Sequence, residues 1–391
     1  MAGDVRSRLA AVGAAPAEIL LPARGVDLSR FAVVACDQYS AQPAYWEKVR
    51  GYVGDAPSAL GLMMPEAWLG RDEAHARAIP ETMERYLRNG TLTSVGEGMV
   101  FLHRVTTAGV RRGLVLALDL EEYDYTPGSR SMIRATEKTV VDRLPPRIEI
   151  RRQAPLEMPH IMVLVNDREN RLMGALDELV KGKETLYDFP LMLNSGRLTG
   201  WLLRSGKELA CVAEALGALA ERAAGGMLYA MGDGNHSFAA AKAHWDAIKG
   251  SLTAEERETH PARRALAEIV NLYDPALTFE PMHRLLMHVD PESAARELGI
   301  DPLNPPSLQE LQPQLDEWVS RHPGAELEYI HGRRDCLELG RASGNLAIVW
   351  ENFDRDSLFS DVEKRGVLCR KSFSMGTADD KRFYLECRKI R

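Results

Sequence analysis

The chain has 391 residues and a net charge of −7, with 27% charged and 45% hydrophobic residues. This length gives room for about two domains with cores of their own, and the composition is typical of a water-soluble globular protein. No apolar run approaches the ~20 residues that cross a bilayer, and the acidic balance disfavours nonspecific nucleic-acid binding. We therefore expect neither a membrane nor a nucleic-acid partner, and the sequence leaves the oligomeric state open.

The five cysteines are widely separated and form no Cys-x-x-Cys pair. Such a pattern favours reduced thiols and argues against a structural zinc site. The first residues, Met1 to Arg6, lack the layout of a signal peptide. A cytoplasmic location is the expectation from these features.

Strand-like and helical segments alternate in the first half of the chain, without internal repeats. The short apolar run 31–35 ends at Asp37 and is followed by a predicted helix over 43–53. Further along, the patterns predict a charged helix over 71–88, paired strands over 99–105 and 113–120, and a buried strand over 160–165.

The second half continues with predicted helices over 172–181, 207–222 and 254–270. Past residue 290 a proline-rich break precedes a predicted helix over 308–321 and short strands near 327–330, 336–339, 346–350 and 382–387. We place a boundary near residue 290, which gives a main body over 1–290 and a smaller α+β part over 291–391. The irregular order of strands and helices favours an α+β fold, with mixed sheets and flanking helices, over a doubly wound sheet.

The most informative segment is a glycine-rich turn between a predicted strand over 227–231 and a predicted helix over 238–249. Strand, glycine-rich turn and helix together direct backbone N–H groups and a helix dipole at an anion. The turn consists of Gly232, Asp233, Gly234, Asn235, His236 and Ser237. It is neither a Walker A loop nor a dinucleotide fingerprint, so it indicates a phosphate or carboxylate site in general terms. The alternative is simple helix capping by Asp, Asn or Ser.

A basic run with one acidic residue forms a second candidate. Its members are Arg134, Glu137, Lys138, Thr139, Arg143, Arg147, Arg151 and Arg152. Guanidinium groups match phosphate geometry, so the run could be a phosphate clamp in which Glu137 orients an arginine or acts as a base. A solvated, salt-bridged surface is the equal alternative.

Two smaller candidates are the turn at Lys371 and Ser372 and the strand end at Asp37. A lysine beside hydroxyl groups and a glycine suits an anion site, but it also suits an exposed turn. Strand ends gather functional residues, although chains also simply turn there.

Taken together, these segments resemble the domain-of-unknown-function family numbered 1015. The segment Gly232–His236 matches the family's Asp-Gly-x-His signature, Glu137, Thr139 and Arg143 match its Glu-x-Thr and arginine element, and Lys371-Ser372 resembles its C-terminal turn. The family is similar to ParB/sulfiredoxin-like proteins, which include free-serine kinases. The resemblance implies a ParB/sulfiredoxin-like element, nucleotide or phosphate binding at 232–237 and, more distantly, phosphoryl transfer. Many relatives carry arginine where this chain has Ser237.

The resulting hypothesis is a kinase-like phosphotransferase that uses ADP or ATP with Mg²⁺ and phosphorylates a hydroxyl metabolite such as a free amino acid. Its expected catalytic residues are Asp233, His236, Asp37 and Glu137, with Asp233 also as the metal ligand. Its expected ligand-binding residues are Gly232, Gly234, Asn235, Ser237, Arg134, Thr139, Arg143, Lys371 and Ser372. We expect Asp233, His236, Glu137, Arg143 and Lys371 to line one cleft.

Two other functions remain open. The same pocket could belong to a non-catalytic protein that responds to a nucleotide. A metal-dependent hydrolase with Asp233 and His236 as ligands is the third reading, although the sequence lacks a His-x-x-x-His pair to support it.

Overall fold

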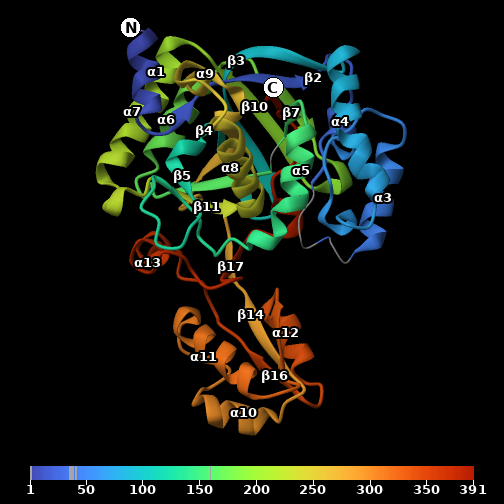
Figure 1. Ribbon diagram of the computed structural model, residues 1–391, viewed down its shortest axis with the longest axis vertical. Helices are drawn as coiled ribbons and strands as arrows, with labels where there is room; N and C mark the ends of the chain where they lie inside the picture. The colour runs from blue at the N-terminus through green and yellow to red at the C-terminus, as the bar shows by residue number, and fades with distance from the viewer. Residues whose placement is uncertain (1, 35–38, 40–41, 159) are drawn as a thin grey trace. The chain divides into compact units, whose positions relative to one another are not determined.

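The computed structural model describes residues 2–34, 39, 42–158 and 160–391. The chain forms two compact units, which are described separately here (Figure 1). Unit 1 contains residues 1–135, 139–277 and 378–391, and unit 2 contains residues 136–138 and 278–377. The predicted division into a main body over 1–290 and a smaller part over 291–391 stays a prediction.

Unit 1 is built on a mixed sheet of eleven strands over the described residues. The main path follows the order β5 (Tyr123–Asp124), β6 (Ile133–Arg134), β11 (Tyr229–Asp233), β8 (Met162–Val165), β12 (Arg264–Asn271), β4 (Gly109–Asp119), β3 (Leu92–Thr106), β10 (Arg197–Leu203) and β9 (Tyr187–Pro190). Two further strands, β1 (Ala14–Ala15) and β2 (Ala17–Pro22), pair with β4 and β3. Pairing is parallel between β8 and β12 and antiparallel between β3 and β4. This mixed sheet with flanking helices confirms the predicted fold class.

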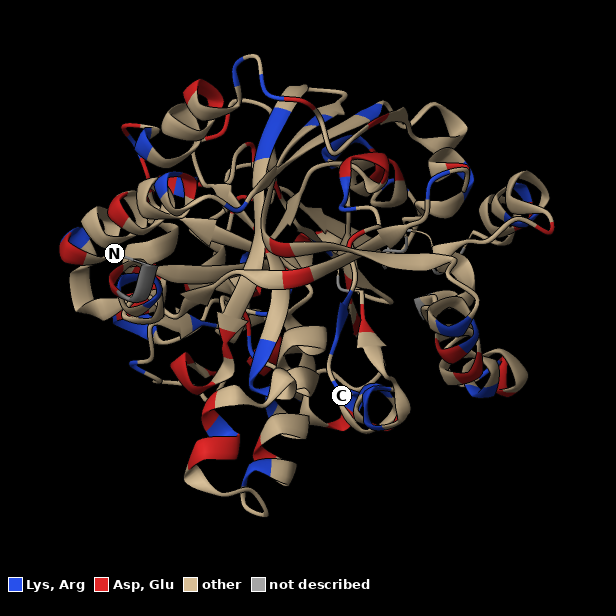
Figure 2. Cartoon of the chain, turned by 90° about the horizontal axis from the view of Figure 1, so that it is seen from above, with Lys and Arg blue, Asp and Glu red and all other residues tan. Residues whose placement is uncertain are grey.

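Helices cover both faces of this sheet, and the strand period decides which side chain meets which helices (Figure 2). Met99 and Phe101 belong to one core, whereas their neighbours Val100 and Leu102 belong to the other. The first core contains residues of α1 (Ala2–Ala10), α6 (Arg171–Val180), α7 (Gly206–Arg222) and α8 (Asn235–Lys249). The second contains residues of α3 (Pro43–Val53) and α4 (Glu73–Arg88). Each face of the sheet therefore has its own hydrophobic core.

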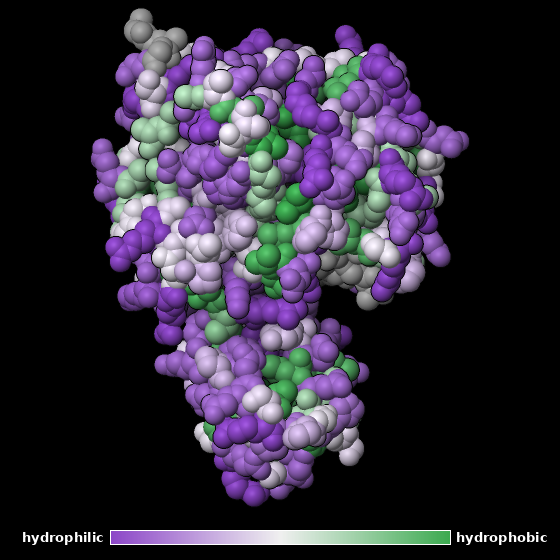
Figure 3. All heavy atoms as spheres, viewed as in Figure 1, coloured by the Kyte–Doolittle hydropathy of each residue, from purple (hydrophilic) through white to green (hydrophobic). Residues whose placement is uncertain are grey.

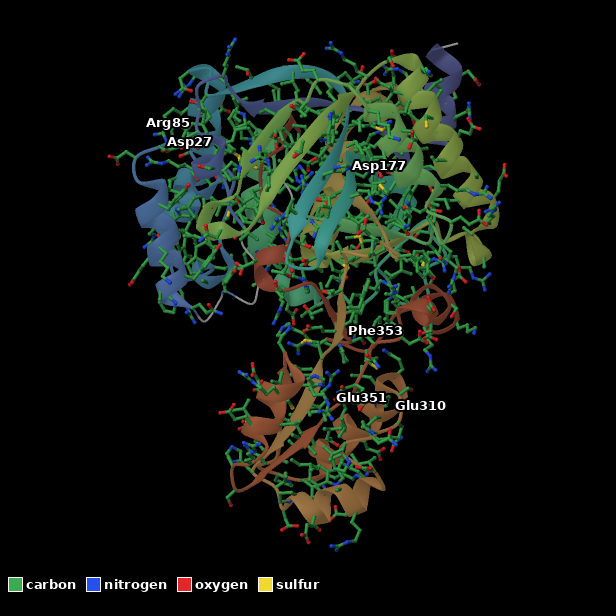
Figure 4. The ribbon with its side chains drawn as sticks, turned by 180° about the vertical axis from the view of Figure 1, so that it is seen from behind. Asp27, Arg85, Asp177, Glu310, Glu351 and Phe353 are labelled. Carbon is green, nitrogen blue, oxygen red and sulfur yellow. The ribbon has the colours of Figure 1, made fainter. Side chains whose placement is uncertain are left out.

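Surface features follow from this layering. The short helix α5 (Pro145–Gln153) lies beside α8, and on the face drawn in Figure 3 apolar residues gather in the region of α8, among hydrophilic ones. On the same face of the sheet, Asp177 of α6, labelled in Figure 4, lies 2.8 Å from His103 Nε2 and 3.1 Å from Arg112 Nη1. No helix in the described part of the chain has the length and apolar content that a membrane crossing needs.

The predicted helix over 254–270 is wrong in its second half. Helix α9 spans only Ala254–Thr259, and the chain then enters strand β12. This strand pairs with β4 on one side and β8 on the other, and every residue from Ala265 to Asn271 is buried. A strand covered on both faces shows no alternation, so its pattern cannot be told from that of a buried helix.

The C-terminal segment 378–391 returns to unit 1 and joins an ion network inside the sheet. Arg382 donates to Glu268 at 2.7 Å and to Glu386 at 2.6 Å, and Arg111 lies 3.4 Å from Glu268. All four side chains are buried. A Cβ atom at Gly113 would lie 2.3 Å from Glu268 Oε1, so this glycine makes room for the carboxylate. Residues 382–387, predicted as a strand, instead make isolated bridges at Tyr384 and Cys387.

Unit 2 contains a three-stranded antiparallel sheet in which β14 (His283–Met287) lies between β15 (Glu326–Ile330) and β16 (Asn345–Ile348). Its core joins Leu286 and Ile348 to α10 (Pro291–Leu298) and α11 (Leu308–Arg321). The segment predicted as a strand over 336–339 is the end of helix α12 (Arg333–Leu339), whose Cys336 is buried against the sheet.

A strand pair, β13 (Phe279–Pro281) with β17 (Phe373–Met375), and helix α13 (Leu358–Arg365) complete unit 2. Phe353, labelled in Figure 4, lies with its ring centroid 5.9 Å from Phe279 and 4.8 Å from Phe373. These aromatic contacts attach the loop that carries Phe353 to the β13–β17 pair.

Because Arg111 and Arg382 would lose their shared carboxylate, the substitution Glu268→Gln should reduce the free energy of unfolding by about 3–5 kcal/mol. Urea unfolding measures this loss. Glu97→Gln is the control, since its exposed pair with Arg6 should contribute no more than ~1 kcal/mol. Equal losses in the two variants would contradict a structural role for the buried network.

The same network predicts acid sensitivity. Burial alone would raise the pKa of Glu268, but the Arg111 and Arg382 charges outweigh it and lower the pKa. A carboxyl group whose folded pKa lies below its unfolded value contributes stability above the unfolded pKa, and that stability is lost as the pH falls through the folded pKa. Stability below pH 4.5 should therefore fall less steeply in Glu268→Gln than in the wild type, and parallel pH profiles would contradict this assignment.

Candidate functional site

The glycine-rich turn joins β11 to α8 in unit 1. Pairing between β11 and β8 shifts register between Met231 and Asp233, which places Gly232 at a bulge. Gly234 is the N-cap of α8, with a left-handed backbone at φ 78°, and a Cβ atom there would lie 3.0 Å from the Ile161 Cα. The helix begins at Asn235, earlier than predicted, so Asn235, His236 and Ser237 form its first turn.

Asp233 lies between the turn and a lysine from the C-terminal segment. Its Oδ1 accepts the Gly234 N–H at 2.8 Å, and its Oδ2 lies 3.1 Å from the Lys381 Nζ. The Lys381 side chain is only 9% exposed. A nearly buried ammonium group is thus held beside the N-terminus of α8, where anions are stabilised.

Sequence reasoning missed Lys381. It follows Asp379 and Asp380 and precedes Arg382, a charged cluster that is typical of a solvated surface. Only the return of the C-terminal segment to the sheet brings this lysine to Asp233, and no local pattern predicts such a contact.

The loop after β6 contacts the first turn of α8, so part of the second candidate does lie beside the first. Asn235 donates to the Thr139 Oγ1 at 3.2 Å and accepts from the Tyr123 hydroxyl at 3.3 Å. His236 Nε2 accepts the Val140 N–H at 3.3 Å. Because that lone pair is used, a neutral His236 ring carries its proton on Nδ1 and presents a donor there.

The arginines of the basic run have different positions. Arg134 is buried on β6 and donates to the carbonyl groups of Ser131, at 2.9 Å, and of Gly225. Arg143 is exposed at the end of the short helix Val141–Arg143. Arg151 pairs with the buried Glu157 at 2.7 Å. Arg134, Arg143 and Arg151 thus have different surroundings, and a phosphate clamp formed by this run stays a prediction.

Glu137, Lys371 and Ser372 come together in unit 2. Glu137 Oε1 accepts the Ser372 N–H at 3.1 Å, and the buried Arg284 donates to the Lys371 and Arg370 carbonyl groups at 3.0 Å. Burial raises the pKa of Glu137, and the backbone N–H groups of Ser372 and Lys371 only partly offset this rise. The turn predicted to bind an anion thus donates to the carboxyl group of Glu137.

For the remaining predicted residues, the structure does not give a position relative to the β11–α8 turn. Asp37 lies outside the described residues. Glu137 and Lys371 belong to unit 2, so a single cleft shared with Asp233, His236 and Arg143 stays a prediction.

No group of three or more His, Cys, Asp or Glu side chains suited to a metal occurs among the residues with described positions. Mg²⁺ is often bound through one or two carboxylates plus phosphate and water oxygens, so Asp233 alone could serve when a phosphate is bound. The Mg²⁺ ligand role of Asp233 therefore also stays a prediction.

Solved structures similar to this chain include a free serine kinase in complex with AMP, with 11% identity over 71% of this chain and 92% of that chain and a TM-score of 0.36. A mutant of free serine kinase in complex with ADP is 12% identical over 69% of this chain and 93% of that chain, with a TM-score of 0.35. A conserved hypothetical protein from Pyrococcus furiosus is 11% identical over 71% of this chain and 95% of that chain, with a TM-score of 0.33.

No curated protein matches the chain significantly. The family described as "Protein of unknown function (DUF1015)" matches residues 20–301, well over half of the sequence. This match confirms the resemblance that the motifs carried. The chain belongs to the DUF1015 family.

Proposed function

We propose that the protein binds the phosphate groups of an adenine nucleotide at the β11–α8 turn and transfers a phosphoryl group to the hydroxyl of a small metabolite. The observation that carries this proposal is the Lys381–Asp233 pair at the N-terminus of α8. Phosphoryl transfer asks a protein mainly for positioning and for stabilisation of negative charge. A helix N-terminus with a nearly buried lysine beside it supplies both.

Under this proposal the residues of the turn have distinct roles. The N-terminal turn of α8 and the Lys381 ammonium bind phosphate oxygens. Asp233 holds Lys381 in place before the nucleotide arrives. His236, whose Nε2 accepts the Val140 N–H, can donate a hydrogen bond from Nδ1.

In the transfer step a bond forms between the acceptor oxygen and the terminal phosphorus, and the bridging P–O bond of the nucleotide breaks. The nucleotide leaves with one phosphate fewer. Once the phosphate has drawn Lys381 away, Asp233 Oδ2 can accept the proton of the acceptor hydroxyl. Asp233 is also the residue that would hold Mg²⁺, which would supply further neutralisation of the phosphate charge.

The direct test incubates the protein with ADP or ATP, Mg²⁺ and a pool of hydroxyl metabolites, and then analyses the products by mass spectrometry. A phosphorylated metabolite that forms only with nucleotide supports the proposal. Tight nucleotide binding without any phosphorylated product would instead favour a nucleotide-responsive binding protein.

The substitution Lys381→Met should weaken ADP binding at least about tenfold, because the phosphate groups lose a nearly buried positive charge. Titration calorimetry measures the affinity, and thermal unfolding checks that the variant is folded. Lys389→Met is the matched control, since Lys389 lies on the same segment but is exposed. Similar affinities of the two variants for ADP would refute the phosphate role of Lys381.

The substitution His236→Gln should leave ADP affinity within roughly tenfold of the wild type, because the glutamine oxygen can still accept the Val140 N–H and a neutral histidine adds little charge. Turnover with an identified acceptor should fall much further. A complete loss of ADP binding in this variant would show that the backbone is not the main phosphate ligand.

Gly234→Val does not test whether the backbone of the turn binds the phosphate. Gly234 has a left-handed backbone and lies close to Ile161, so any side chain at this position disturbs the folded turn itself.

A further inference from the structure

An open pocket of about 640 Å³ lies in unit 1, and three segments distant in sequence line it. Tyr39, Gln42 and Tyr45 come from the start of α3 and the residues before it. Leu193 and Asn194 come from the turn between β9 and β10, and Asp379 comes from the C-terminal segment. The roles derived above for the β11–α8 turn do not use this pocket.

One wall of the pocket is a pair of stacked tyrosines with fixed orientations. The Tyr39 and Tyr45 rings are parallel within 3°, with centroids 3.6 Å apart. The Tyr39 hydroxyl donates to Asp379, and the Tyr45 hydroxyl donates to the Val34 carbonyl at 3.2 Å. Because each ring is stacked on the other and its hydroxyl is hydrogen-bonded, the two tyrosines form a rigid aromatic surface before any ligand binds.

A strained turn contributes an apolar side chain to the same pocket. Leu193 and Asn194 have consecutive left-handed backbones, with φ of 54° and 61°. Arg104 holds this turn by donating to the Ser195 carbonyl at 2.6 Å. Leu193 nevertheless remains 38% exposed, which is unusual for a large apolar residue in a costly conformation. Because the strained backbone of Leu193 does not bury its side chain, the strain indicates a role in binding.

We propose that this pocket binds the purine base of the nucleotide whose phosphates bind at the β11–α8 turn. The inference rests on the proposed function. A nucleobase stacks on aromatic rings and packs against apolar side chains, as Tyr45 and Leu193 allow. The amide groups of Gln42 and Asn194 match the donor and acceptor edge of adenine, and Asp379 can accept from its amino group or from ribose hydroxyls.

The chain itself links the base pocket to the phosphate turn. Asp379 lines the pocket, and Lys381, two residues later, contacts Asp233. Two residues span at most about 7.6 Å between Cα atoms. One short segment of unit 1 therefore carries a residue of each of the two sites.

Three probes separate the two parts of the site: adenosine for the pocket, pyrophosphate for the turn, and ADP for both. Calorimetry measures each affinity for the wild type, Tyr45→Ala, Leu193→Asn and Tyr52→Ala. Asparagine tolerates the left-handed backbone, so Leu193→Asn removes apolar surface without adding strain. Tyr52→Ala is the matched control, because Tyr52 is an exposed tyrosine of the same helix that does not line the pocket.

The base-pocket proposal expects Tyr45→Ala to weaken ADP and adenosine binding at least about tenfold, and Leu193→Asn at least about threefold, with pyrophosphate affinity unchanged. Tyr52→Ala should leave all three affinities unchanged. Unchanged ADP affinity in both pocket variants would overturn the proposal, as would an equal loss for ADP and pyrophosphate.

The outcomes also distinguish this proposal from the proposed function. Adenosine binding that depends on Tyr45, together with no pyrophosphate binding, would leave the pocket in place and remove the phosphate site. Pyrophosphate binding that depends on Lys381, together with no adenosine binding, would remove the pocket alone.

Discussion

The buried carboxylate of Glu268 is the constraint on which the arrangement of unit 1 depends. A carboxylate inside a sheet stays ionised only if cations reach it, and Arg382 supplies one of them from the C-terminal segment. This pairing anchors the segment to the sheet. The same pairing fixes the residues just before Arg382. Lys381 forms an ion pair with Asp233, and Asp379 accepts a hydrogen bond from the Tyr39 hydroxyl. One ion network therefore positions both the cation beside the turn and the carboxylate of the pocket.

Local signals were enough to predict the turn itself. An apolar run, two glycines and an alanine-rich helix follow each other within a few residues, and each signal acts at short range. The predicted helix began too late only because Gly234 takes the N-cap, which leaves Asn235 and His236 inside the helix. Lys381 could not be predicted, since its position depends on a pairing between β12 and a segment more than a hundred residues away.

The errors in the predicted secondary structure also arise from contacts between segments that are distant in sequence. The sequence pattern of β12 resembles that of a helix because burial on both faces removes the alternation that marks a strand, and the buried Glu268 interrupts its apolar run. The sequence of the turn at Lys371 predicts an anion site, and within unit 2 the carboxyl group of Glu137 accepts its backbone N–H groups. Sequence alone cannot say whether an anion-binding turn serves a ligand or a side chain of the same protein.

The residue after the Asp-Gly-Asn-His run is the uncharged Ser237, which raises the question of which cation would face a phosphate. Arg134 donates to backbone carbonyl groups of its own surroundings, and Lys371 belongs to unit 2. Lys381 is a cation at the turn, and its ammonium is a compact charge that can exchange one anion for another. Under the proposed function, Asp233 neutralises Lys381 while the site is empty and becomes a proton acceptor once the phosphate takes the lysine. In the proposed reaction a lysine–aspartate pair at this position would supply both the charge and the base, which a bidentate arginine bound to phosphate would not.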